Sequence, residues 1–416
     1  WTCKPVEYVK VCPTYGPGFF YIPGTTTCLK VGGTVGFYAY GVTGYRQATD
    51  TVNSYGFVTI TMDARDNSEY GMVRTFGAVT VGRSSGSDDN SGSWPRRGLA
   101  GAAATGNYSA LQTLTNLNAY VQIGGFTAGR LNSFALVNQP LMIQTQAAPS
   151  GGPVNQFAYT ASLGNGMSIT AAAEDAAELR EGLSGATANG SPNRVPDAVL
   201  SFDVAQSWGT VKVAGVAHEV VVAGRDTTAN SPWGYAGMAG AKINLPMIAA
   251  GDNITVHGAY AHGAAGRAIG AIATNTATDG TQTSGAGSLG VGRVNTGLFD
   301  AVQTATTTTL TTSYSYGGTF QHFFSPTVSA YLGGTYGKMD YPGSVQNTTT
   351  RKDGAFWMAT LGVIWTPVAG LSVTPEIAYT KLTVSAPMDN TIAAMDGAAK
   401  KSDDKWVGRL RVQRTF

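Results

Sequence analysis

The stretch WVGRLRVQRTF, residues 406–416, decides how the rest of the chain is interpreted. Taken two residues at a time, one set of its side chains contains Trp406, Leu410 and Val412, and the set between them contains Arg409 and Arg411. This period of two predicts a β-strand, because successive side chains leave a strand on opposite faces. In a soluble sheet the apolar face would cover a core, whereas in a membrane barrel it would face lipid. The stretch alone leaves both interpretations open.

The composition indicates an all-β chain. Only 12% of the 416 residues are charged, about half the usual share for a soluble domain, and 55 are glycine. No apolar run approaches the ~20 residues of a membrane-spanning helix. The net charge of +2 comes without a basic block, so we expect no nucleic-acid partner.

Alternating stretches recur along the chain and predict about 16 antiparallel strands. The turn Gly164–Asn165–Gly166 is typical of a hairpin. Short connections alternate with long Gly/Ser/Thr-rich ones. The short connections are residues 164–166, 206–209, 325–326 and 366–370, and the long ones are 182–196, 225–231, 263–309, 342–354 and 385–404. A membrane barrel sorts its loops in this way, with short periplasmic turns and long external loops.

Aromatic residues at strand ends favour the same architecture, since they would form interfacial girdles. They are Phe324, Trp365, Tyr379, Trp406 and Phe416. The alternative is that they are core residues of a soluble β-sandwich.

Residues 130–153 form a long connection without clean alternation, yet apolar residues such as Phe134 recur in it. Loops of this length are often functional. The apolar content predicts that the segment packs on something, and in a large barrel the inside wall is available. Its candidate constriction residues are Arg130, Phe134, Asn138, Gln139 and Gln144.

The cysteines Cys3, Cys12 and Cys28 all lie in the first 28 residues, which we interpret as an extension preceding the barrel at 29–416. In an oxidising compartment Cys12 and Cys28 could bridge, and the alternative is three free thiols. The chain begins at Trp1 without a leader-like segment, which fits either a removed signal peptide or none.

Several ordered stretches resemble the Rhizobiales-type outer-membrane general porins of alphaproteobacteria. They include PVEYVKVCPTYGPGFFYIPGTTTCLKVGG (5–33), AYVQIGGFTAGR (119–130), FAYTASLGNGMSITAAAED (157–175) and LGVIWTPVAGL (361–371). The resemblance implies a trimeric porin with a 16-stranded barrel in the Gram-negative outer membrane. It also implies that the third external loop, residues 130–153, folds inward, and that Cys12 pairs with Cys28.

No arrangement of residues suggests catalysis. The four histidines are scattered over different strands, except that His257 and His262 share one, where their spacing of five puts them on opposite faces. No metal-binding, nucleophile or phosphate-loop motif occurs. We therefore expect no enzymatic activity, no metal and no cofactor.

Alternation predicts which charged side chains face the lumen. On the closing strand and the first three strands we expect a basic wall made of Lys30, Arg65, Arg74, Arg409 and Arg411, with Asp63 as an acidic exception. Farther around the barrel lie Glu174, Asp203, Lys212, Lys242 and Glu376. A basic wall facing a loop with few acids predicts a non-specific or slightly anion-favouring pore. The alternative is that these residues are solvated and have no effect on selectivity.

The expected function is passive diffusion of small hydrophilic solutes and ions through a water-filled channel. The expected partners are two further copies, outer-membrane lipid including lipopolysaccharide, and the solutes themselves. Two rivals remain. A substrate-specific channel could use an aromatic track of Tyr38, Tyr40, Tyr70 and Phe76, and a surface protein or adhesin of little conductance could use the loop 263–309.

Overall fold

The structure is a computed structural model. It describes residues 10–42, 52–84, 112–137, 152–175, 177, 179–184, 194–221, 231–269, 287–291, 294–303, 307–346, 351–387 and 400–416.

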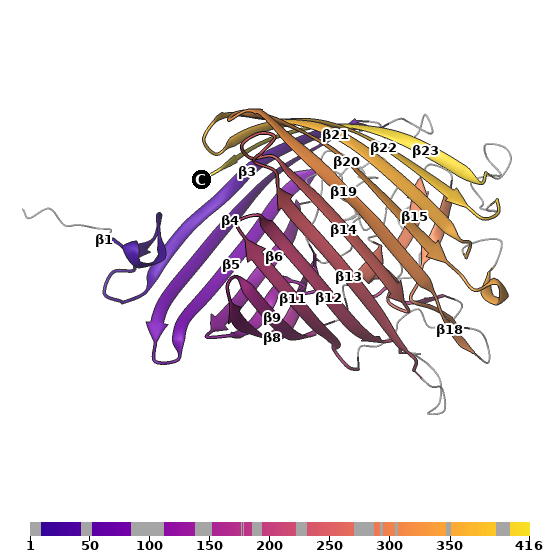
Figure 1. Ribbon diagram of the computed structural model, residues 1–416, viewed down its shortest axis with the longest axis horizontal. Coiled ribbons are helices and arrows are strands. Elements are labelled where there is room, and N and C mark those ends of the chain that lie inside the picture. Colours follow the sequence, from indigo (N-terminus) through magenta and orange to yellow (C-terminus); the bar gives the residue numbers. More distant parts are fainter. Residues whose placement is uncertain are drawn as a thin grey trace, which may run out of the picture.

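Sixteen antiparallel strands form one closed barrel (Figure 1). Each strand pairs with the next along the chain, and the last pairs with the first. This arrangement confirms the predicted fold class. In chain order the strands are β3 (Cys28–Val42), β4 (Val52–Ser68), β5 (Gly71–Ser84), β6 (Gln112–Ile123), β7 (Phe126–Asn132), β8 (Pro153–Gly164), β9 (Met167–Glu174), β11 (Asp197–Gln206), β12 (Gly209–Glu219), β13 (Trp233–Asn244), β14 (Asn253–His262), β19 (Thr312–Ser325), β20 (Val328–Asp340), β21 (Gly354–Val368), β22 (Leu371–Val384) and β23 (Ser402–Thr415).

The strand β23 closes the barrel against β3. Their register runs from Val407 opposite Val42 to Thr415 opposite Thr34. Two further backbone hydrogen bonds, each 3.0 Å long, join Gly33 and Phe416. The predicted contiguity of the last strand with the first three is therefore correct.

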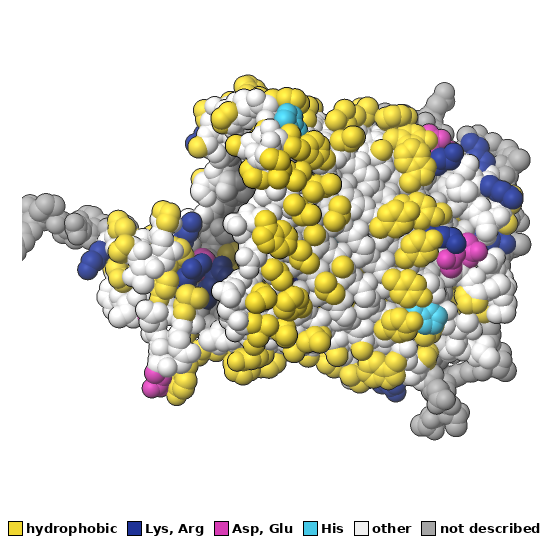
Figure 2. Space-filling view, viewed as in Figure 1, with side chains coloured by type: hydrophobic (Ala, Val, Ile, Leu, Met, Phe, Trp, Pro, Cys, Tyr) yellow, Lys and Arg dark blue, Asp and Glu magenta, His cyan; other side chains and the backbone are white. Residues whose placement is uncertain are grey.

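Alternation along β23 divides its side chains as the sequence predicts. Trp406 and Leu410 are 48% and 40% exposed, whereas Val407 between them is 1% exposed. Figure 2 shows hydrophobic side chains spread over the face of the barrel wall in view, with most of the charged side chains on that face lying toward its two ends. A wall that is apolar on its outside suits a lipid environment.

One predicted turn lies elsewhere in the structure. The strand β21 runs past Pro367 to Val368, because a register shift after Trp365 removes the need for a ladder hydrogen bond at the proline.

The N-terminal extension is tied to the barrel at the end where the chain terminates. Its strands β1 (Lys10–Val11) and β2 (Phe20–Tyr21) pair with each other, and β2 pairs with β3 at Cys28 and Leu29. The disulfide between Cys12 and Cys28 confirms the predicted pairing and closes a loop with a sequence separation of 16. A crosslink of this span stabilises the folded state by about 3 kcal/mol. Cys3 lies outside the described residues.

Several short elements occupy segments expected to be plain external loops. They are α1 (Ala265–Ala268), the hairpin of β15 (Gly287–Val291) and β16 (Val294–Leu298), and a small sheet of β10 (Leu183–Ser184), β17 (Ala301–Gln303) and β18 (Thr308–Leu310). Residues of α1, β16 and β17 are buried in an apolar cluster inside the barrel that includes the wall residues Met238, Phe356 and Leu382. Leu183 of β10 and Ala301 of β17 form a second small cluster with Val220. Within the described ranges no helix has the length and apolar character needed to cross a bilayer.

Gly33 provides a test of the closure. A Cβ at this position would lie 2.4 Å from the backbone oxygen of Thr59 and 3.0 Å from the Phe416 ring. Gly33→Val is therefore expected to lower the free energy of unfolding from lipid vesicles by about 1–3 kcal/mol, measured by tryptophan fluorescence in urea.

The matched control is Gly215→Val on β12, where a Cβ would meet no atom within 4 Å. This control is expected to leave stability unchanged or slightly raised, because valine favours strands. Equal losses in both variants would contradict the steric explanation.

Candidate pore and inward-folded loops

The third external loop turns into the barrel directly after β7. The carboxylate of Glu174 accepts hydrogen bonds from the Phe134 backbone N–H at 2.8 Å and from the Ser133 hydroxyl at 2.7 Å. The Gln156 side chain donates to the carbonyls of Leu131 and Asn132, at 2.9 and 3.0 Å. The first residues of the loop are therefore held by inward-facing side chains of β8 and β9.

The Phe134 side chain shows how far this segment reaches. Its ring centroid lies 5.9 Å from Nζ of Lys212 on β12, although three strands separate β12 from β7. Ala135 and Val137 are 1% and 3% exposed. The described start of the loop thus lies against the inside wall. Asn138, Gln139 and Gln144 lie outside the described residues.

Arg130 does not take part in this inward turn. The register places it opposite Ala119 and Asn155, on the face of the sheet that carries the exposed side chains of Phe126 and Phe157. That face is the outer one, because alternation continues through β7 to its last residues. The expectation that Arg130 belongs to the constriction was therefore wrong about its face.

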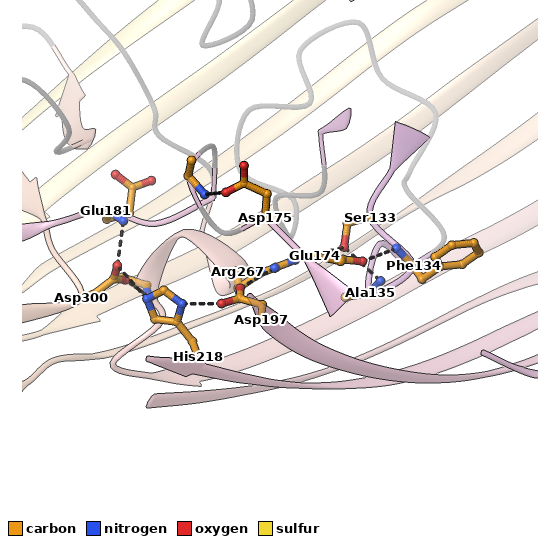
Figure 3. A network of polar contacts seen from close by, with 12 residues as sticks. Ser133, Phe134, Ala135, Glu174, Asp175, Glu181, Asp197, His218, Arg267 and Asp300 are labelled. Atoms are coloured by element: carbon orange, nitrogen blue, oxygen red, sulfur yellow. Dashed lines mark hydrogen bonds and ion pairs between the residues drawn. The ribbon is translucent and has the colours of Figure 1, made fainter. Parts of the chain in front are cut away.

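A buried polar network joins three external segments to the wall (Figure 3). Arg267 of α1 is 1% exposed and donates to Ser133 Oγ at 3.0 Å, to Glu174 Oε2 at 3.0 Å and to Asp197 Oδ2 at 2.5 Å. The other oxygen of Asp197 lies 2.7 Å from His218 Nδ1. His218 Nε2 in turn lies 3.7 Å from Asp300.

Asp300 links the far end of this network to two further segments. Its carboxylate accepts hydrogen bonds from the backbone N–H groups of Glu181, at 2.8 Å, and Ala265, at 2.6 Å. Burial raises the pKa of the Asp300 carboxyl, against the opposing effects of His218 and the two N–H groups. The network is a structural anchor for the loops.

Sequence reasoning placed Glu174 in the lumen and missed Arg267. Glu174 does point inward, but it is 0% exposed beneath the loops and does not face pore water. Arg267 lies in the stretch GAAGRAIGA, which looked like an ordinary flexible loop. The apolar residues around this single charge could have predicted that the segment packs inside the barrel, as the apolar residues of 130–153 did for that segment.

The predicted basic wall consists of two groups at different levels. Near the short turns, Arg65 and Arg74 both form two-pronged hydrogen bonds to Asp63, at 2.8–3.0 Å. Lys30 lies opposite Asp63 in the register. Arg409 and Arg411 lie opposite Tyr40 and Tyr38, at least eight residues from Lys30 along β3 and hence about 26 Å away.

The other inward-facing charges are mixed. Asp203 and Lys212 form an ion pair at 3.2 Å across β11 and β12. Glu376 accepts a 2.6 Å hydrogen bond from the Tyr331 hydroxyl and lies opposite Arg409. Within the described part of the chain, Lys30, Lys242 and Arg411 form no ion pair.

The aromatic residues proposed for a solute track are divided in the same way. Tyr38, Tyr55 and Phe57 stack with centroid distances of 5.5 and 5.7 Å, and Phe76 stacks on Tyr120 at 5.2 Å. Phe76 lies opposite Asp63, six residues from Phe57 along β4, which is roughly 20 Å. Tyr70 is 72% exposed in the short turn between β4 and β5. These residues do not form one continuous track.

Among the described residues no His/Cys/Asp/Glu group could hold a metal ion.

A closed barrel with an apolar outside, charges inside and a third loop whose first residues turn inward defines a transmembrane β-barrel of the porin class. Comparison with known sequences agrees. The profile of the family described as Porin subfamily matches residues 2–409, so the chain belongs to this porin family.

Individual relatives are more distant. The chain is 27% identical over 219 residues to the porin Omp2b of Brucella suis, a match covering 51% of this chain and 57% of the relative. It thus spans little more than half the length of the curated relatives it matches.

Among solved structures, the outer-membrane channel DcaP of Acinetobacter baumannii is similar with a TM-score of 0.63 at 13% identity, over 95% of this chain and 99% of that one. Pseudomonas putida OprB is similar with a TM-score of 0.52 at 12% identity, over 93% and 94%. These likenesses concern the fold alone. Membership of the porin family places the protein in the Gram-negative outer membrane.

The position of the third loop can be tested by crosslinking. In a Cys3→Ser background, Phe134→Cys with Lys212→Cys is expected to form an intramolecular crosslink with a short bifunctional thiol reagent. The reason is that the Phe134 ring and Lys212 Nζ are 5.9 Å apart. A mobility shift in denaturing gels measures the yield.

The control pair is Phe134→Cys with Arg411→Cys, since Arg411 lies on β23, on another part of the wall. Crosslinking of both pairs, or of the control pair alone, would contradict the described position of the loop.

Proposed function

We propose that the protein forms a water-filled channel for passive diffusion of small hydrophilic solutes and ions across the outer membrane. The observation that carries the proposal is the contrast between the two faces of the wall. Lys242 and Arg411 point inward and have no ion-pair partner within the described ranges, while side chains such as Leu410 and Ile377 cover the outside. Unpaired charges require water, so they support a wet lumen inside an apolar cylinder.

A slight preference for anions follows from the pairing of the inward charges. The acids Asp63 and Asp203 each have a basic partner, and Glu174 is buried against Arg267. Lys30, Lys242 and Arg411 are left to face the water, and we propose that they line the permeation path. Fixed cations along a pore raise the local concentration of anions.

Two alternatives are less well supported. An adhesin would need 263–309 on the surface, yet the described parts of that segment are mostly buried inside the barrel. A channel specific for one class of solute would need an unbroken row of aromatic side chains along the lumen. Phe57 and Phe76 are separated by six residues along β4 and do not form such a row.

Planar-bilayer recording of the purified protein tests the proposal. We expect ohmic unitary conductance and, in a KCl gradient, a reversal potential that indicates a higher permeability for chloride than for potassium. Asp63→Asn should increase this preference for chloride, because Arg65 and Arg74 would lose the carboxylate they share. Asp66→Asn is the control, since Asp66 instead accepts from Thr26 and Thr27 near the N-terminal extension.

Absence of conductance, with liposomes that fail to swell in small sugars, would refute the channel. Strong cation selectivity would refute only the anion preference.

We also propose that three copies associate through the wall near the closing seam. Gly408 of β23 lies opposite Gly41 of β3 on the outer face, and Gly56 of β4 lies nearby opposite Phe37. A Cβ at Gly408 or Gly56 would meet no atom within 4 Å, so neither glycine is required by packing within the chain. A smooth surface of this kind lets a second wall approach closely.

Gly408→Trp is expected to convert the assembly to monomers with little effect on barrel stability, measured by analytical ultracentrifugation in detergent. Gly215→Trp on β12, far from the seam, is the control and should leave the assembly unchanged. Monomers in both variants, or in neither, would argue against this surface.

A further inference from the structure

Residues 263–311, here called the inserted segment, connect β14 to β19. Of these, 263–269, 287–291, 294–303 and 307–311 are described. The segment was expected to be a long surface loop, but its described parts lie against the inner face of the barrel. Figure 1 shows β15 and β18 at the end of the barrel that carries the long connections.

One side of the inserted segment rests on β19. Ser315 Oγ donates to the carbonyl of Ala268 at 2.6 Å, and Ser313 Oγ donates to the carbonyl of Ala265 at 3.3 Å. Both serines are inward-facing, since Tyr316 beside them is 56% exposed on the outside whereas Ser315 is 2% exposed. The helix α1 therefore covers the inside of the wall.

The other side reaches across to β21 and β22. The hairpin of β15 and β16 lies against β22, and Thr296 Oγ1 donates to the carbonyl of Lys352 at 2.7 Å. Val294 and Leu298 are 0% exposed, in one cluster with the inward-facing Phe356 and Leu382. The described parts of the inserted segment thus touch the wall on two sides, α1 at β19 and the β15–β16 hairpin at β22.

The inserted segment and the third loop share one anchor. Glu174 Oε2 accepts from both Ser133 of the third loop and Arg267 of the inserted segment, and Glu174 Oε1 accepts from Phe134. Without Arg267, the carboxylates of Glu174 and Asp197 would be buried without their shared cation. A buried charge without a partner strongly destabilises the structure around it, so the loops held by these carboxylates would be expected to move.

We propose that α1 and the β15–β16 hairpin of the inserted segment form a second constriction element, and that Arg267 is the positioning residue that sets where they and the start of the third loop sit in the lumen. This inference rests on the proposed channel function. Solutes would pass beside both loops, so the narrowest cross-section would depend on their common anchor at Glu174. Arg267 itself, being 1% exposed, does not contact the solute.

The test combines Arg267→Gln with a thiol probe that does not depend on conduction. In a Cys3→Ser background, Ser315→Cys places a nearly isosteric thiol under α1. We expect this thiol to be protected from a membrane-impermeant maleimide in the parent protein and to be labelled in Arg267→Gln. Unitary conductance and the size limit for sugars in liposome swelling should both rise.

Arg194→Gln is the matched control. Arg194 also pairs with a glutamate, Glu219, at 2.6 Å, but its side chain is 55% exposed and outside the network. We expect neither labelling nor conductance to change in this variant. Heat-modified migration in gels confirms that each barrel is folded.

The outcomes separate the two proposals. If the parent protein conducts and Arg267→Gln changes neither protection nor conductance, the role of Arg267 is refuted. If labelling changes but no variant, including the parent, conducts, the channel function fails while the anchoring by Arg267 stands. Should Arg267→Gln not fold, replacing residues 270–306 with a short Gly-Ser linker decides the matter, because an unchanged size limit would refute the second constriction.

Discussion

The pairing of β3 with β23 is the interaction on which the rest of the structure depends. Lipid offers no hydrogen-bond partner, so an open strand edge in a bilayer would leave several backbone groups unsatisfied, each costing several kcal/mol. The ladder continues to Phe416, whose backbone pairs with Gly33. Beyond that point β3 extends past the end of β23, and β2 takes up the pairing at Leu29 and Cys28. The disulfide-linked extension therefore covers part of the β3 edge that β23 leaves open.

Closure gives the wall two environments, but its inner face is not uniformly polar. Near the short turns it carries Asp63, Arg65 and Arg74, whereas toward the long loops it carries Met238, Phe356, Met358 and Leu382. Leaving such apolar side chains in water would cost about 1.5–3 kcal/mol each. The external segments that fold inward cover them, so the composition of the wall itself requires loops inside the barrel. The polar part of the lumen is correspondingly confined to the remaining surface.

The strands and their faces could be predicted because a period of two is a local property. Trp406, Leu410 and Val407 lie on the faces that alternation assigns to them. The positions of the inward loops could not be predicted, because they depend on contacts such as Arg267 with Glu174, which are distant in sequence. A usable signal was present on the strands: Met238 and Phe356 interrupt what should be polar inward positions. The position of each charge along the barrel axis could not be predicted either. Alternation gives the face of the sheet on which Lys30 and Arg411 lie, but not the distance between them along the barrel.

The buried network also influences the charge of the pore, although it does not line it. Glu174, Asp197 and Asp300 are withdrawn beneath the loops, where one arginine and one histidine contact them. Each acid used as an anchor is an acid removed from the lumen, while Lys30, Lys242 and Arg411 stay without ion-pair partners in the described ranges. A chain with a net charge of only +2 can in this way present a basic lumen. The preference for anions then follows because acids are buried in the network while basic side chains face the lumen. Charges that face the water act most strongly on a passing ion.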